Sequence, residues 1–425
     1  MTTCQKNIYP AESADVKHFI SGEKKRNDHY LHAVIRFDWN VDIDLLKKAV
    51  QATFKAVPLL TCRFVESDRK AFWEEAGWTA DDMVFLIKSP DRERDVQDNL
   101  VIKPDEKVGP QLRITVIRDE EADTLAIILN HMICDGGGIR DYLYLLSKCY
   151  SAFAVDPDHA IVDMPDPGLR SIHQVFGSMS PEQMGRIRNA ELQSYPQSEK
   201  DHLPLTGDAQ HPFIITHQVP AAQFDLIKDY AKTRGATVND ALFAAYVCAL
   251  SDALKTDWIV LDCPVNIRAY LPKGHQPGIC NLTSNIICAV PSHAGESFDE
   301  ALMSVKKVMD QQKGNLEPLK VYWDLEEVYQ TLPLSEAKKR FPQIYSIPFN
   351  GMTNIGILDD KQLYFNGLRV EDALISGSIK YAPYFQIAVT TFRKAMTFST
   401  NFHGTDDDYR WLDNFVNKMI GYFPK

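Results

Sequence analysis

The most informative stretch of this sequence is GPQLRITVIRDEEADTLAIILNHMICDGGGIRDYLYLLSKCY, which covers residues 109–150. Two runs rich in strand-forming residues, 111–118 and 124–130, flank the acidic segment DEEAD, and this order predicts a β-hairpin. A helical stripe of apolar residues opens at Ile139 and runs towards Tyr150. The loop HMICDGGG therefore joins a predicted strand to a predicted helix.

His131 leaves the second of these strands and enters a tight turn, where glycines are expected to permit unusual backbone angles. Asp135 follows four residues later and can hold the loop or orient the imidazole through a hydrogen bond. A neutral imidazole fixed in this way has a suitable pKa for a general base. The alternative is a turn in which His131 and Asp135 only satisfy one another.

Strands and helices alternate on both sides of this stretch. Apolar periodicity predicts strands at 30–39, 211–219, 258–265, 282–290, 384–392 and 395–402, and helices at 41–57, 221–234, 238–254 and 406–422. Between about 155 and 212 the sequence is rich in proline and charge, which predicts a connection between two halves. We therefore expect an α/β protein with mixed sheets in two domains, 1–165 and 211–425, joined by a linker at 166–210.

Composition excludes several classes of protein. The 425 residues carry 46 Lys and Arg against 57 Asp and Glu, a net charge of −11, which disfavours broad capture of nucleic acid or of an anionic membrane. The longest apolar run, 241–250, is about half of a membrane span, and the first residues lack the apolar stretch that a secretion signal needs. The eight cysteines form no CxxC pair and are expected to be buried hydrophobes in a reducing compartment. We expect a cytoplasmic protein without an integral membrane segment.

Several segments in register resemble the CoA-dependent acyltransferase superfamily. They are the stretch 109–150 with its HxxxDG pattern, VDIDLLKKAVQATFKAVPLLTCRF at 41–64, RGATVNDALFAAYVCAL at 234–250, CPVNIRAYLP at 263–272 and TNIG at 353–356. The superfamily includes chloramphenicol acetyltransferase, alcohol acetyltransferases, wax-ester synthases and the condensation domains of nonribosomal peptide synthetases. The resemblance implies two similar chloramphenicol-acetyltransferase-like halves, each a mixed sheet with flanking helices, and an active channel at their interface.

The resemblance also implies roles for individual residues. His131 matches the second histidine of the HHxxxDG motif, which is the catalytic base, and Asp135 matches the motif's aspartate, which is mainly architectural and pairs with an arginine from the other half. Arg268 matches that arginine, and Gly136 occupies a turn position that needs no side chain. Asn130 stands where the motif has its first histidine, which favours the stand-alone acyltransferases over peptide-forming condensation domains. The C-terminal DFGWG motif of the plant branch is absent from the sequence.

The implied function is transfer of an acyl group from a thioester, either acyl-CoA or an acyl carrier protein, to a small-molecule alcohol or amine. Candidate contacts to the oxyanion or the substrate are Asn130, Gly137, Thr353 and Asn354, although Thr353 and Asn354 also fit ordinary turn chemistry. The reaction requires neither a metal nor a bound cofactor. The alternative function is a catalytically silent, condensation-domain-like binding or docking module. The sequence leaves the acyl chain, the acceptor, the type of donor and the choice of ester or amide open.

Overall fold

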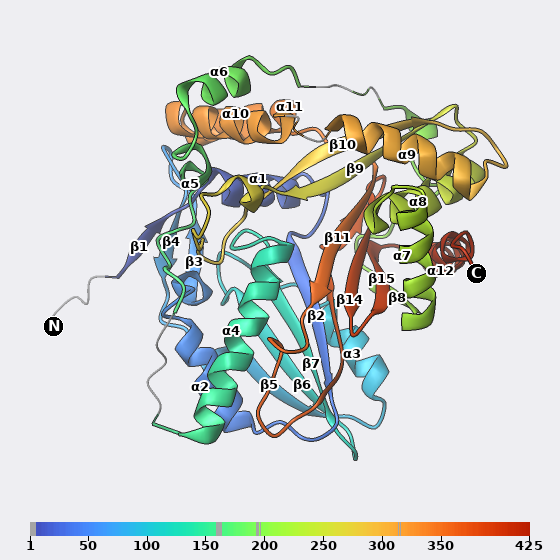
Figure 1. Ribbon diagram of the computed structural model, residues 1–425. Coiled ribbons are helices and arrows are strands. Elements are labelled where there is room, and N and C mark those ends of the chain that lie inside the picture. Colours follow the sequence, from blue (N-terminus) through green and yellow to red (C-terminus); the bar gives the residue numbers. More distant parts are fainter. Residues whose placement is uncertain (1–5, 159–163, 193–194, 196, 313, 315) are drawn as a thin grey trace.

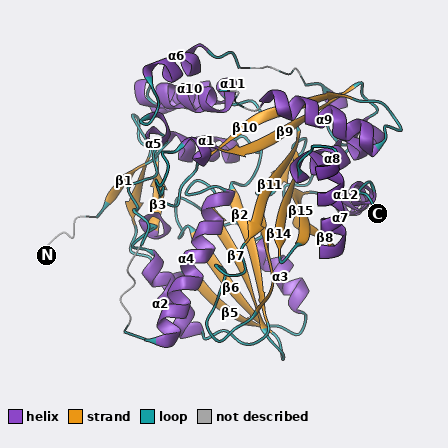
Figure 2. Cartoon of the chain, viewed as in Figure 1, coloured by secondary structure: helices purple, strands orange, loops and turns teal. Residues whose placement is uncertain are grey.

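The computed structural model describes residues 6–158, 164–192, 195, 197–312, 314 and 316–425. Within them the strands form two large mixed sheets and one small antiparallel sheet, and helices lie against the sheets (Figures 1 and 2). Each large sheet belongs mainly to one half of the chain. The expected α/β fold, with a mixed sheet and flanking helices in each half, is confirmed.

The first large sheet has the strand order β12-β2-β7-β6-β5. Its strands are β2 (Tyr30–Phe37), β5 (Val84–Lys88), β6 (Leu112–Arg118), β7 (Asp123–Asn130) and β12 (Val370–Ser376). Neighbouring strands are antiparallel except for β5 and β6, and the predicted β6–β7 hairpin is confirmed. Strand β12 comes from the C-terminal half and pairs with β2, an exchange that the sequence pattern did not predict.

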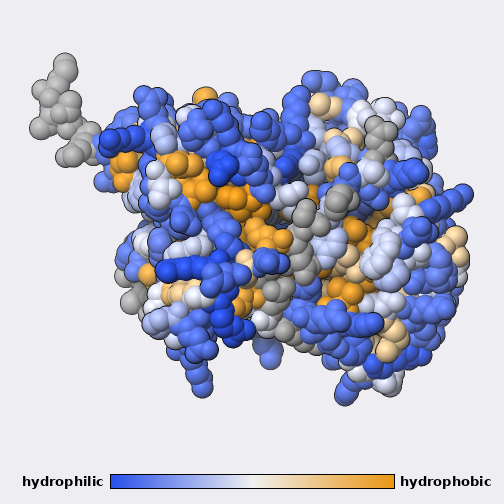
Figure 3. All heavy atoms as spheres, turned by 90° about the horizontal axis from the view of Figure 1, so that it is seen from above, coloured by the Kyte–Doolittle hydropathy of each residue, from blue (hydrophilic) through white to orange (hydrophobic). Residues whose placement is uncertain are grey.

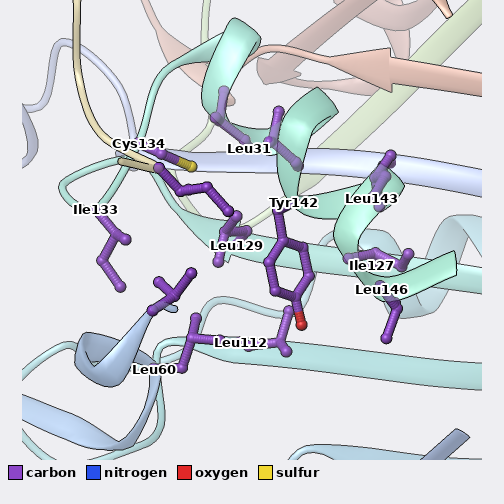
Figure 4. Packing of buried hydrophobic residues seen from close by; sticks show 14 of the residues in the cluster. Leu31, Leu60, Leu112, Ile127, Leu129, Ile133, Cys134, Tyr142, Leu143 and Leu146 are labelled. Carbon is purple, nitrogen blue, oxygen red and sulfur yellow. The ribbon is translucent and has the colours of Figure 1, made fainter. Parts of the chain in front are cut away.

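Both faces of the first sheet are buried. Its helices are α2 (Ile43–Thr53), α3 (Arg92–Leu100) and α4 (Gly136–Val155). Because side chains alternate along a strand, Ile127 and Leu129 of β7 share a buried cluster with α2 and α4, whereas Ala126 belongs to a cluster with α3. Figure 4 shows Tyr142 of α4 reaching into the first cluster towards Leu112. This packing fixes the place where β7 ends and α4 begins.

The second large sheet has the order β10-β9-β11-β14-β15-β13, and β8 also pairs with β15. Its strands are β8 (Pro212–Val219), β9 (Trp258–Asn266), β10 (Thr283–Pro291), β11 (Asn350–Leu358), β13 (Lys380–Tyr381), β14 (Phe385–Phe392) and β15 (Ala395–His403). Helices α7 (Ala221–Thr233), α8 (Val238–Leu254), α9 (Phe298–Gln312) and α12 (Asp406–Gly421) accompany it. The predicted capping box of Thr237 and Asp240 starts α8, whose central residues are buried on all sides.

The remaining elements are a small sheet and further helices. The small sheet contains β1 (Ile8–Pro10), β3 (Cys62–Val65) and β4 (Phe72–Glu75), and the other helices are α1 (Ser13–Glu23), α5 (His173–Phe176), α6 (Pro181–Asn189), α10 (Glu317–Thr331) and α11 (Leu334–Ile344). Short 3-10 helices are η1 (Pro58–Thr61), η2 (Ala80–Asp82), η3 (Glu199–Asp201) and η4 (Ile267–Tyr270). Helices α5 and α6 lie in the segment expected to be a linker, and their apolar residues join a buried cluster with α10. The domain boundaries at 166–210 stay a prediction.

Seven of the eight cysteines are buried and free, as expected, and Cys4 lies outside the described residues. Among the helices that the structure describes, none combines the length and the apolar character needed to cross a bilayer. The face seen from above in Figure 3 is largely hydrophilic, with hydrophobic side chains gathered in smaller groups.

Candidate active site

A cavity of about 210 Å³ lies between the two halves of the chain. The first half contributes α1, the loop after β7 and the start of α4, and the second half contributes β9, β10, β11 and β13. The predicted site residues that line it are His131, Asp135, Gly136, Gly137, Thr353 and Asn354. The tertiary structure thus brings the strand-end histidine to residues more than 200 positions away in the chain.

Contacts from both sides hold the loop that carries His131. The backbone N–H of His131 donates to the carbonyl oxygen of His29 at 2.9 Å, which extends the β2–β7 pairing. From the other half, Asn281 Nδ2 donates to the carbonyl oxygens of His131 and Met132, each at 2.9 Å. Sequence reasoning missed Asn281, because these partners are 150 and 149 positions away and no local pattern links them.

Asn130 lies behind the loop and does not line the cavity. Its Nδ2 donates to Gln111 Oε1 at 2.7 Å, and its Oδ1 accepts from the backbone N–H of Met132 at 2.8 Å. The side chain is fully buried. This geometry gives no support to the predicted oxyanion or substrate contact of Asn130, since its amide is used to hold the turn.

Asp135 links the two halves beside the cavity. Both terminal nitrogens of Arg268 donate to its carboxylate, at 2.9 and 3.0 Å. The backbone N–H of Leu282 (2.6 Å), Thr283 Oγ1 (2.7 Å) and the backbone N–H of Gly138 (2.8 Å) donate to the same group. Burial by itself would raise the pKa of Asp135, but the charge of Arg268 and these hydrogen bonds outweigh it and lower the pKa to about 2. Asp135 is therefore an ionised structural carboxylate near neutral pH.

The three glycines at the start of α4 provide space rather than unusual backbone angles. None of Gly136, Gly137 and Gly138 has a positive φ, so the prediction about their backbone angles is wrong. A Cβ atom on Gly138 would lie 2.5 Å from the Cβ of Cys134, and one on Gly137 would lie 3.1 Å from Arg268 Nη1. The helix start can approach the loop and the arginine closely only because these positions lack side chains.

The imidazole of His131 stacks on that of His18 from α1, with ring centroids 3.9 Å apart and an angle of 24° between the rings. Among the described residues, no other residue offers a hydrogen-bond partner to the buried Nδ1 of His131. Burial, together with the charges of Lys17 and Lys380, lowers the pKa of His131 to about 4. His131 is therefore neutral near physiological pH and can accept a proton.

Among the predicted site residues that line the cavity, Gly136, Gly137 and Thr353 have groups that can donate a hydrogen bond to a developing oxyanion. The N–H groups of Gly136 and Gly137 belong to the first turn of α4 and have no acceptor within that helix. Thr353 is half-buried on β11, whereas Asn354 is exposed at a bulge and accepts from the N–H of Gly356 at 3.0 Å. The contact of Asn354 with the N–H two residues later is the ordinary turn chemistry that its sequence position also fits, whereas Thr353 lies within the strand.

A second group of polar residues in the cavity was not predicted from the sequence. Lys17 and Lys380 line it, as does Asp262, whose Oδ1 accepts from Asn285 Nδ2 at 2.6 Å. The hydroxyl of Tyr345 donates to Asn285 Oδ1 at 2.9 Å. These residues come from five separate segments of the chain, so no spacing rule connects them. Sequence reasoning could have identified Asp262, because a carboxylate inside the apolar run WIVLDCPV is unusual.

Comparisons by sequence find nothing: no family model matches the chain, and no curated protein matches it. Comparisons by structure match the whole chain. Trichothecene 15-O-acetyltransferase TRI3 from Fusarium sporotrichioides is similar with a TM-score of 0.70 and 14% identity, covering 100% of this chain and 98% of that chain.

Two multidomain synthetases provide further similar structures. The epimerization domain from the third module of tyrocidine synthetase B gives a TM-score of 0.68 at 13% identity, covering 99% of this chain and 96% of that chain. The first condensation domain of the calcium-dependent antibiotic synthetase gives 0.67 at 13% identity, covering 99% and 97%. The chain therefore has the two-lobed fold of condensation domains and acyltransferases, a fold that carries more than one reaction among these proteins.

Proposed function

We propose that this chain, which has the fold of acyltransferases and condensation domains, transfers an acyl group from a thioester to a hydroxyl or amine acceptor. The thioester is acyl-CoA or an acyl carrier protein, used as a co-substrate, and no further cofactor takes part. The observation that carries the proposal is the position of His131, a neutral imidazole on the wall of a cavity lined by both halves. The cytoplasmic location stays a prediction.

In the proposed reaction, His131 accepts the proton of the acceptor as the acceptor's oxygen or nitrogen attacks the carbonyl carbon of the thioester. The C–S bond of the tetrahedral intermediate then breaks, and the proton passes to the leaving thiolate. The products are an ester or amide and a free thiol. Because both substrates meet at one histidine, no covalent acyl-enzyme is needed. Asp135 is bound to Arg268 throughout and acts as a positioning residue for the loop.

The same cavity offers stabilisation for the oxyanion that forms on the thioester carbonyl. The N–H groups of Gly136 and Gly137 point out of a helix N-terminus, where the helix dipole favours negative charge. Thr353 Oγ1, from β11, is the side-chain candidate among the residues that line the cavity. Loss of one such donor typically lowers kcat by roughly 10²–10³.

The test is a screen of acyl-CoA donors against mixed alcohols and amines, followed by mass spectrometry, with wild-type protein and His131→Ala. We expect the variant to lower kcat by roughly 10²–10⁴ while the thermal unfolding midpoint changes little. His293→Ala is the matched control, because His293 is exposed in a loop outside the cavity. Turnover that His131→Ala leaves unchanged would exclude the mechanism.

The same screen separates an enzyme from a silent docking module. A module that only binds should retain acyl-CoA in native mass spectrometry yet form no product with any acceptor. Two observations favour the enzyme: the neutral imidazole of His131 lines the cavity, and so do Gly136 and Gly137, whose N–H groups have no acceptor within α4.

A further inference from the structure

Two buried lysines share the cavity with His131. Lys17 on α1 and Lys380 in β13 have only 4% and 8% of their surface exposed. Lys17 Nζ donates to the hydroxyl of Tyr322 at 3.0 Å and lies 4.8 Å from the ring centroid of Tyr345. Lys380 Nζ has neither a hydrogen-bond acceptor nor an ion-pair partner among the described residues. An unpaired buried charge is costly, so this arrangement indicates that something else completes it.

The other charges around the cavity form no ion pair with either lysine among the described residues. Asp135 is compensated by Arg268, and Arg140 forms an ion pair with Asp141. Asp262 is the remaining carboxylate among the described lining residues, and its contact is to Asn285 rather than to either ammonium group. Asp28 is buried near Lys380 and favours its charged form, but it does not line the cavity, and its Oδ1 accepts from the backbone N–H groups of Tyr30 and Ile379. Among the described residues, neither Lys17 nor Lys380 therefore has a carboxylate within ion-pair distance.

The pKa values of these groups determine the charges that they carry at pH 7. Burial is the main cause that lowers the pKa of Lys17 and of Lys380, each to about 8, so both ammonium groups are mostly protonated at pH 7. Burial also raises the pKa of Asp262 to about 6, which leaves it mostly ionised at that pH. The nearby positive charges oppose protonation of His131. A bound anion would relieve the cost of burying the two ammonium groups.

We propose that the cavity binds a small molecule carrying one carboxylate, which Lys17 and Lys380 hold, and that this molecule is one of the two transfer substrates. The inference rests on the proposed function for the substrate's role, but not for its binding. The two ammonium groups, which have no ion-pair partner among the described residues, can hold one carboxylate, whereas a dianion would bring more negative charge close to Asp262 and Asp28. Leu31, Pro264 and Ile347 supply apolar wall for the organic part of such a molecule.

Binding can be tested with benzoate, its neutral analogue benzamide, and inorganic phosphate as probes in isothermal titration calorimetry at pH 7. We expect saturable binding of benzoate that is stronger than that of benzamide or phosphate. Lys380→Met should weaken benzoate binding by about 10- to 100-fold, the range for a hydrogen bond to a charged group, and should leave benzamide unaffected. Lys339→Met is the control, because Lys339 is exposed on α11 and pairs with Glu336.

The variants are expected to fold, because methionine keeps the length of lysine and removes an unpaired buried charge. Lys17→Met provides a second variant, and a wild-type unfolding midpoint confirms folding for each. The NMR titration of His131 gives an independent readout, since a bound carboxylate should raise the pKa of its imidazole. Equal binding of benzoate and benzamide, tighter binding of phosphate, or an unchanged benzoate affinity in both folded lysine variants would overturn the inference.

These results separate the two proposals. Benzoate binding that depends on the lysines, without any acyl transfer, would support the anion site and contradict the proposed enzyme activity. Acyl transfer that depends on His131, without selective benzoate binding, would support the enzyme and contradict the anion site. If both hold, carboxylate-bearing substrates should lose about 10- to 100-fold in kcat/KM in Lys380→Met, while matched neutral substrates keep theirs.

Discussion

His131 is half-buried and lines the cavity, and this position determines how activity should depend on pH. Protonation removes the base, so kcat/KM falls as the pH drops through the pKa of the folded protein. With that pKa near 4, activity towards a neutral acceptor should persist well below the ordinary histidine value of about 6.5. A pH–rate profile measures this, with circular dichroism showing that the protein is folded at each pH. An acidic limb at pH 6–7 would contradict a desolvated His131.

His18 is expected to position the imidazole of His131 by stacking at 3.9 Å. His18→Ala should open space beside the ring, lower kcat by roughly 10- to 100-fold and, by admitting water, move the acidic limb upwards. His18→Phe keeps a flat ring, so it should retain most of the activity and keep the acidic limb of the pH–rate profile at its wild-type position. If His18 had only a structural role, both variants would change the unfolding midpoint and neither would move the acidic limb of the pH–rate profile. Measuring kcat, the pH–rate profile and the unfolding midpoint of both variants therefore tests the positioning role.

At the scale of the element, the N-terminus of α4 depends on close approach to the loop before it. Gly138→Ala places a Cβ 2.5 Å from Cys134 and 3.0 Å from the carbonyl oxygen of Cys280, both in a buried setting. We expect a loss of about 1–3 kcal/mol in the free energy of unfolding, the usual effect of overpacking. Gly136→Ala is the matched control in the same helical turn, because its nearest neighbour, Ile355, lies at an ordinary 3.4 Å. Chemical denaturation measures both, and equal effects would contradict a steric cause specific to Gly138.

At the scale of the whole molecule, the pair of Asp135 and Arg268 joins residues 133 positions apart. Side-chain exposures of 1% and 13% mean that removing one partner leaves the other charge buried and unpaired. Asp135→Asn and Arg268→Met should each cost about 3–5 kcal/mol, and the double variant should cost less than the sum. A double-mutant cycle by urea denaturation measures the coupling. Additive costs would show that Asp135 and Arg268 do not stabilise one another.

The ion pair of Asp135 and Arg268 also determines how the free energy of unfolding should change at acidic pH. The pKa of Asp135 is lowered to about 2 in the folded protein, against roughly 3.9 in an unfolded chain. Its contribution to stability is therefore complete above about pH 4 and is lost as the pH falls from 4 to 2. Stability curves of wild-type protein and Asp135→Asn should converge over that window. Curves that stay parallel down to pH 2 would show that the carboxylate is not stabilised in the folded state.

Some features of the fold could be predicted locally, because they depend on neighbours in the chain. The hairpin of β6 and β7 follows from alternating strand formers around an acidic turn, and the start of α8 follows from Thr237 and Asp240. Strand β12 was missed because its pairing partner β2 lies more than 300 residues earlier, and pairing over that distance leaves no periodic signal. The linker prediction overlooked α5 and α6, whose apolar residues are buried by contact with distant segments that include α1, η4 and α10.

The sequence by itself determined the α/β class and identified His131 as the candidate base, because strand end, histidine, aspartate and glycines are consecutive in one loop. Only the tertiary structure decided what surrounds that base. His18, Lys17, Lys380 and Asp262 meet His131 in one cavity because α1, β9 and β13 converge there. Burial, charge and the resulting pKa values depend on distances in space. The residues concerned are spread from position 17 to position 380, and no local sequence pattern contains the distances between them.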